Sequence, residues 1–140
     1  MTELGRAATE HAIDVPGADG SVLTLSWGAA TDVGRRRDHN EDSYLVGAPF
    51  FVVADGMGGH LAGDRASDAV VRRLEQSVDG AFSSRKQIQQ ALLLATADIE
   101  RAAGGNALGA GTTVTGLALV SSDGQPAALV FNVGDSRTYR

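Results

Sequence analysis

No cysteine occurs among the 140 residues of this chain, so disulfides, thiolate metal sites and a cysteine nucleophile are excluded. No apolar run approaches the roughly 18 residues that a membrane span needs. The first residues lack the apolar core of a signal peptide, and a cytoplasmic location is therefore the default expectation. The formal net charge of −5 argues against nucleic acid as a partner.

The sequence nevertheless has enough apolar residues to build one folded domain. Hydrophobic residues make up 43% of the chain, and its length is that of a single domain. Residues 1–20 mix small, charged and turn-forming residues without a period, which predicts a flexible N-terminal tail. Residues 21–140 are then expected to form the folded part.

Hydrophobic periodicity beyond the tail predicts an ordered series of elements. Partial alternation over residues 21–30 indicates a strand, and two apolar runs flanking residues 47–49 indicate a hairpin. Two helices follow, the second capped by Ser83 or Ser84, and then a second hairpin over residues 114–133. The last strand of that hairpin is nearly all apolar, so both of its faces are expected to be covered. This order fits an α+β fold with helices outside packed sheets.

The most informative stretch is residues 52–60, where an apolar strand ends in a carboxylate and a glycine-rich turn leads to a histidine. Asp55 supplies a hard oxygen ligand of the kind that Mg²⁺ or Mn²⁺ prefers. The glycines allow the main chain to approach a bound ion closely. Taken alone, the same residues would also fit a plain turn with a capping aspartate.

A second acidic cluster lies shortly upstream, over residues 35–43. In the predicted hairpin, Glu41 and Asp42 begin the first strand and Asp55 ends the second, so all three lie at the same end of the sheet. Clustered carboxylates repel one another unless a cation neutralises them. Arg37 beside them suits a phosphate oxygen. A solvated loop whose charges cancel is the alternative interpretation.

Three motifs in order resemble those of the metal-dependent protein phosphatases, the PPM family or type 2C serine/threonine phosphatases, in their bacterial form. The resemblance covers roughly residues 25–140 and implies a four-layer αββα sandwich with metals in a cleft at one edge of the sheets. The absence of a cysteine nucleophile agrees with hydrolysis by a metal-activated water. The three motifs are Arg37-x-x-Asn40-Glu41-Asp42-Ser43, Ala54-Asp55-Gly56-Met57-Gly58-Gly59-His60 and Gly134-Asp135-Ser136-Arg137.

The resemblance implies hydrolysis of phosphoserine and phosphothreonine in proteins by a water that bridges two Mn²⁺ or Mg²⁺ ions. Its substrates would be phosphorylated proteins, such as the targets of a serine/threonine kinase. The implied roles are Asp55 as the carboxylate bridging both ions, Glu41 and the Gly56 carbonyl on the second ion, Asp42 as a ligand through water or an orienting group, Asp135 at a weaker third ion, and Arg37 on the substrate phosphate.

His60 is the remaining catalytic candidate, and its role stays open. Eukaryotic members of the family commonly carry a histidine directly after the Asp-Gly pair, where it protonates the leaving group. Met57 occupies that place here, and His60 lies three residues further on. It could reach the leaving group, contact the substrate or do neither.

The family also places metal-binding aspartates well downstream of the position where this sequence stops, at Arg140. We therefore expect an N-terminal part of a catalytic domain, truncated relative to the family fold. Such a part is expected to be inactive or weakly active alone and to associate through exposed apolar surface. The alternative is a non-catalytic, phosphatase-like module that regulates or binds phosphoproteins.

Overall fold

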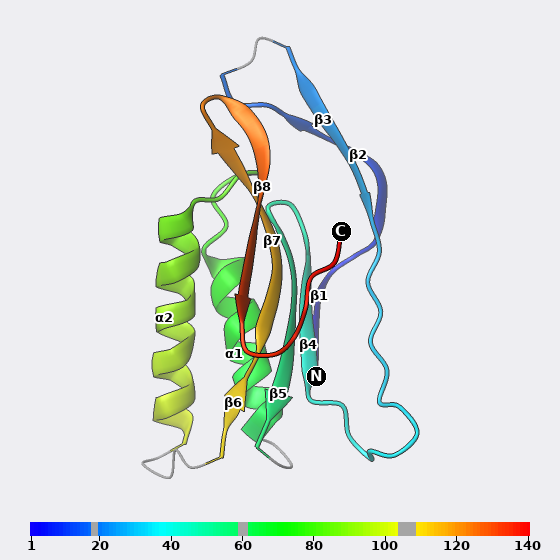
Figure 1. Cartoon of the computed structure of the whole chain (residues 1–140), viewed down its shortest axis with the longest axis vertical. Coiled ribbons are helices and arrows are strands. Elements are labelled where there is room, and N and C mark those ends of the chain that lie inside the picture. Colours follow the sequence, from blue (N-terminus) through cyan, green and yellow to red (C-terminus); the bar gives the residue numbers. More distant parts are fainter. Residues whose placement is uncertain (18–19, 59–61, 104–108) are drawn as a thin grey trace.

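A computed structural model describes residues 1–17, 20–58, 62–103 and 109–140. The two helices lie side by side on one face of the larger sheet, as Figure 1 shows. The helices are α1 (Ala62–Gln76) and α2 (Arg85–Ala102), and the strands are β1 (Thr2–Gly5), β2 (Ala8–Asp14), β3 (Val22–Trp27), β4 (Asp42–Gly47), β5 (Phe50–Met57), β6 (Gly111–Thr112), β7 (Val114–Ser122) and β8 (Gln125–Val133).

The larger sheet has the strand order β1-β4-β5-β7-β8, with β6 paired to β5, and β2 and β3 form a separate two-stranded sheet. Among the strands of the described residues, only β1 runs parallel to its neighbour, and the other strand pairs are antiparallel. The mixed α+β fold that the sequence predicts is therefore confirmed. So is the hairpin, because β4 and β5 pair with Asp42 opposite Asp55.

The core lies between the helices and the larger sheet. Every second residue of β5 is buried from Phe50 to Gly56, and the buried residues of α1 recur at three- to four-residue intervals. These two periods bring one apolar face of the sheet against one face of the helix. The core comprises Leu45, Phe50, Val52, Ala54, Val70, Val71, Leu74, Ile88, Ala91, Ala95, Val114 and Ala118.

The N-terminal region differs from the sequence prediction of a flexible tail over residues 1–20, because β1 and β2 form within it. The N–H and C=O groups on the free edge of β4 accept β1 as a parallel neighbour, and Leu4 packs against the core. β2 pairs with β3 across the predicted boundary at residue 20. Trp27 of β3 then meets Phe51 of the larger sheet edge to face, with ring centroids 5.1 Å apart.

The sheet face opposite the helices carries exposed apolar side chains in the described part of the chain. Val130 of β8 is 58% exposed, so the prediction that both faces of this strand are covered was wrong for the described residues. Only its alternate residues, Leu129 and Phe131, pack towards the helices. Neither α1 nor α2, the helices within the described residues, is long and apolar enough to cross a membrane.

The two helices are joined by an ion pair between Arg73 of α1 and Asp98 of α2. Arg73 Nε donates to Asp98 Oδ2 at 2.5 Å. Within α2, Nη2 of Arg101 lies 2.9 Å from the other carboxylate oxygen of Asp98. The hydrogen bond from Arg73 holds the pKa of Asp98 below its ordinary value of 3.8. A carboxyl whose pKa is lowered in the folded state stabilises the fold at pH values above its ordinary pKa. This stabilisation is lost as the pH falls through the pKa of the folded state.

We therefore expect Asp98→Asn to lower the free energy of unfolding at neutral pH, with the difference shrinking as the pH falls below 3.8. Urea unfolding of both proteins across an acidic pH series measures this. Asp79→Asn is a matched control, because Asp79 makes no ion pair within the described residues. A difference that stays constant across the series would contradict the prediction.

Candidate functional site

A cleft of about 210 Å³ lies at the end of the sheet where β4 begins and β5 ends. A larger, mainly apolar groove of about 390 Å³ runs along the open face of the sheet, but no aspartate or glutamate lines it among the described residues. The small cleft therefore has the chemistry that the sequence predicts. Its lining includes the predicted site residues Arg37, Glu41, Asp42, Asp55 and Gly56.

Asp42 and Asp55 face each other across the first pair of β4 and β5. Burial raises the pKa of Asp55, and the charge and hydrogen bonding of the Asp42 carboxyl raise it further. The charge of Asp135 acts in the same direction, and only Arg37 opposes it. The site thus concentrates negative charge, which a bound cation would relieve.

Glu41 carries the least satisfied oxygen of the site. Its side chain is 9% exposed, and Oε1 is buried without a hydrogen-bond partner among the described residues. Oε2 lies 4.0 Å from Nη1 of Arg37, which is itself 75% exposed. A buried carboxylate oxygen without a hydrogen-bond partner costs the folded state free energy. Binding a cation would offset that cost, so this oxygen is suited to be a metal ligand.

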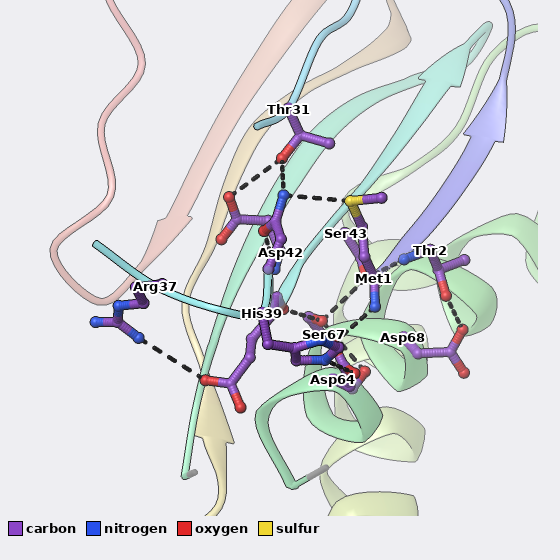
Figure 2. Close-up of polar contacts among 12 residues, drawn as sticks. Met1, Thr2, Thr31, Arg37, His39, Asp42, Ser43, Asp64, Ser67 and Asp68 are labelled. Atoms are coloured by element: carbon purple, nitrogen blue, oxygen red, sulfur yellow. Dashed lines mark hydrogen bonds and ion pairs between the residues drawn. The ribbon is translucent and has the colours of Figure 1, made fainter. Parts of the chain in front are cut away.

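The loop before β4 is held by a small polar network that the sequence alone did not reveal. Asn40 Oδ1 accepts from the Asp42 amide at 3.0 Å, and Asn40 Nδ2 donates to Thr31 Oγ1 at 2.8 Å. The Thr31 hydroxyl donates in turn to Asp42 Oδ2 at 3.3 Å, as Figure 2 shows. Asn40 stands inside the recognised motif, but no pattern in the sequence marks Thr31 as its partner.

Asp64, in the first turn of α1, gathers a second set of contacts beside the cleft. It pairs with His39 and with the amino group of Met1, the latter at 2.7 Å. Burial alone would raise the pKa of Asp64, but these two groups lower it overall. His39 therefore links the loop before β4 to the first turn of α1.

Two glycines allow α1 to approach the site closely. A Cβ on Gly56 would lie 2.3 Å from the Gly63 carbonyl oxygen and 2.7 Å from the Glu41 carbonyl oxygen. A Cβ on Gly63 would lie 2.8 Å from Cδ of Glu41. Gly56 and Gly63 therefore allow α1, β5 and the loop before β4 to pack closely together.

The other predicted residues are placed less directly. Asp135 follows β8 and reaches Asp55 through its charge, but it does not line the cleft. Met57 ends β5 and is 63% exposed. His60 lies outside the described residues.

Within the described residues, no group of three or more His, Cys, Asp or Glu side chains is already arranged as a metal site. The fit of this cleft to a metal ion therefore rests on the chemistry of its individual oxygen ligands. Two facing carboxylates and the orphan oxygen of Glu41 are the hard ligands that Mn²⁺ and Mg²⁺ accept.

Comparisons with known proteins agree on one group of relatives, although no protein-family model matches the chain. It is 36% identical over 128 residues to the serine/threonine phosphatase stp of Listeria welshimeri, covering 78% of this chain and 47% of that protein. It is 36% identical over 129 residues to the serine/threonine protein phosphatase PstP of Mycobacterium tuberculosis, covering 84% of this chain and 23% of that protein. The chain thus spans about half the length of the Listeria relative.

Two solved structures are similar in fold. PppA, described as a key regulatory component of T6SS in Pseudomonas aeruginosa, matches with a TM-score of 0.56 and 33% identity over 64% of this chain and 41% of that chain. The catalytic domain of PstP in complex with two manganese ions matches with a TM-score of 0.55 and 27% identity over 69% of this chain and 50% of that one.

Proposed function

Because the chain belongs to the PPM family of bacterial serine/threonine protein phosphatases, we propose that it takes part in Mn²⁺- or Mg²⁺-dependent hydrolysis of phosphoserine and phosphothreonine in proteins. The observation that carries this proposal is the buried Oε1 of Glu41, which has no hydrogen-bond partner among the described residues and lies beside the facing carboxylates of Asp42 and Asp55. Three acidic groups at one cleft repel one another unless a cation neutralises them.

In this proposal the metal ligands are the residues that gather at the cleft, with Asp135 at a weaker third position. When two ions are bound, they supply an activated water nucleophile and stabilise charge on the phosphoryl oxygens. Asp55 would hold the ions, and Asp42 would either bind through water or orient its neighbour. The proposed set is Glu41, Asp42, Asp55, the carbonyl of Gly56, and Asp135.

Arg37 is proposed to bind the substrate phosphate. Its guanidinium is mostly exposed, yet it stands at the cleft within 4.0 Å of Glu41. A planar guanidinium can donate two parallel hydrogen bonds to phosphate oxygens and so orient the group for attack. His60 is proposed as a proton donor to the leaving group or as a substrate contact.

The proposed substrates are phosphorylated proteins, including those that serine/threonine kinases modify, and the proposed location is the cytoplasm. The second candidate function is a phosphoprotein-binding or regulatory module. It is favoured by one observation, that no ready-made metal group stands in the described residues. The two functions differ in whether a bound phosphopeptide is hydrolysed.

The test is phosphate release from a phosphothreonine peptide by the protein expressed from its complete reading frame. We expect release only with Mn²⁺ or Mg²⁺, and we expect Arg37→Ala to raise KM for the peptide by roughly 10- to 100-fold, as losing a hydrogen bond to a charged group does. Arg36→Ala is the matched control, since Arg36 is exposed but does not line the cleft. Peptide binding without metal-dependent release would favour the regulatory module instead.

A further inference from the structure

Helix α1 is tied to the main chain of Glu41 by a buried hydroxyl. Ser67 Oγ donates to the Glu41 carbonyl oxygen at 2.6 Å, and the side chain of Ser67 comes from the second turn of α1. Both Ser67 and its neighbour Ser43 are 0% exposed. Two hydroxyls in a fully buried position cost free energy unless their hydrogen bonds are made, and here they are made to each other and to the site loop.

Figure 2 draws these contacts, and the donors and acceptors give them one consistent direction. The Thr2 amide donates to Ser43 Oγ at 3.0 Å, and Ser43 Oγ lies 2.9 Å from Ser67 Oγ. Because each hydroxyl has one proton and the Ser67 proton is directed to Glu41, Ser43 donates to Ser67. The Asp64 carbonyl, at 3.2 Å, is the longer alternative acceptor for Ser67. The chain of bonds thus runs from β1 through β4 and α1 to Glu41.

The same face of α1 also limits where the Glu41 carboxylate can lie. The position of a Cβ on Gly63 would fall 3.0 Å from each carboxylate oxygen, so the carboxylate lies directly against the first turn of the helix. The partial positive charge of a helix N-terminus favours a carboxylate there. α1 therefore contacts Glu41 at both its main chain and its side chain.

We propose that Ser67 is a positioning residue that holds Glu41 in place for metal binding, an inference that rests on the proposed function. A site on a loop keeps its geometry only if packed elements and hydrogen bonds restrain it. Removing the hydroxyl would leave the Glu41 carbonyl and the Ser43 hydroxyl without their partner, and the loop would be free to shift away from α1.

The experiment is titration of the protein with Mn²⁺, followed by the electron paramagnetic resonance signal of free Mn²⁺ at a temperature where each variant is folded. We expect Ser67→Ala to weaken Mn²⁺ binding by about 10- to 100-fold, the range for groups that orient a metal ligand. Ser43→Ala should weaken it less, because Ser67 keeps its bond to Glu41. Ser43→Ala also tests the inference if Ser67→Ala does not fold.

Ser77→Ala is the matched control. The Ser77 hydroxyl makes a similar bond, to the Leu74 carbonyl at 2.7 Å, at the far end of α1. Ser77→Ala should lower stability without changing Mn²⁺ affinity. If the role of Ser67 were merely structural, Ser67→Ala would likewise lower stability and leave Mn²⁺ affinity unchanged. Ser67→Ala with unchanged affinity, while Glu41→Gln loses binding, would overturn the inference and leave the proposed function standing. No Mn²⁺ binding by the unsubstituted protein would overturn the proposed function itself.

Discussion

Replacing Asp55 with asparagine is expected to lower metal-dependent phosphate release by about a thousandfold or more, corresponding to about 4 kcal/mol of lost transition-state stabilisation. Asparagine keeps the shape of the side chain but removes the charge proposed to be shared between two ions. Turnover of a phosphothreonine peptide at saturating Mn²⁺, by the protein expressed from its complete reading frame, measures the loss. Asp14→Asn, an exposed position in β2, is the control and should retain activity.

The same substitution is expected to stabilise the metal-free protein. Burial and the Asp42 carboxyl raise the pKa of Asp55, so its ionisation costs the folded state stability as the pH rises through that raised pKa. Asparagine removes this cost, so Asp55→Asn should unfold at higher urea concentration at pH 7 with chelator present. The advantage should be under about 1 kcal/mol, because the pair is partly solvated, and should disappear below the ordinary value of 3.8. Lower stability at pH 7 would show that the two carboxylates do not repel in the folded state.

Gly56→Ala is expected to have the largest effect on the fold, a loss of about 3 kcal/mol in the free energy of unfolding. The added methyl would fall 2.3 Å from the Gly63 carbonyl oxygen and 2.7 Å from that of Glu41. Both neighbours are backbone atoms, so no side-chain rotation can relieve the contact. The helix, the strand or the site loop must move apart, and Mn²⁺ binding should weaken as well.

Urea unfolding followed by circular dichroism gives the stability change. Gly28→Ala is the matched control, since a Cβ at Gly28 meets nothing within 4 Å. Equal unfolding midpoints for the two variants would mean that α1 does not approach β5 as closely as the structure has it.

Local patterns predicted the part of the site that lies within one hairpin. The turn at residues 47–49 separates two apolar runs, and antiparallel pairing on either side of it brings Asp42 opposite Asp55. Arg37 stands four residues before Glu41 and remains within ion-pair distance of it. The helices were also predictable, because an amphipathic period and a capping serine are local features; Ser84 caps α2 by accepting from the Gln87 amide.

The sequence did not predict how residues far apart support that hairpin. β1 joins the sheet through an edge that only folded β4 provides, and β8 is less covered than its apolar composition indicates. Hydrophobic periodicity does not predict which strand edge another strand will pair with, or whether a sheet face will be covered by another element.

The sequence by itself thus determined the family, the α+β class and the acidic cluster at one end of a hairpin, because each is read from short motifs or local periodicity. Only the tertiary structure decided how the cluster is held. Ser67 reaches Glu41 across 26 residues, and Thr2 reaches Ser43 across 41. Such contacts form when burial of the apolar faces brings α1 and β1 against β4, and no local pattern encodes their partners.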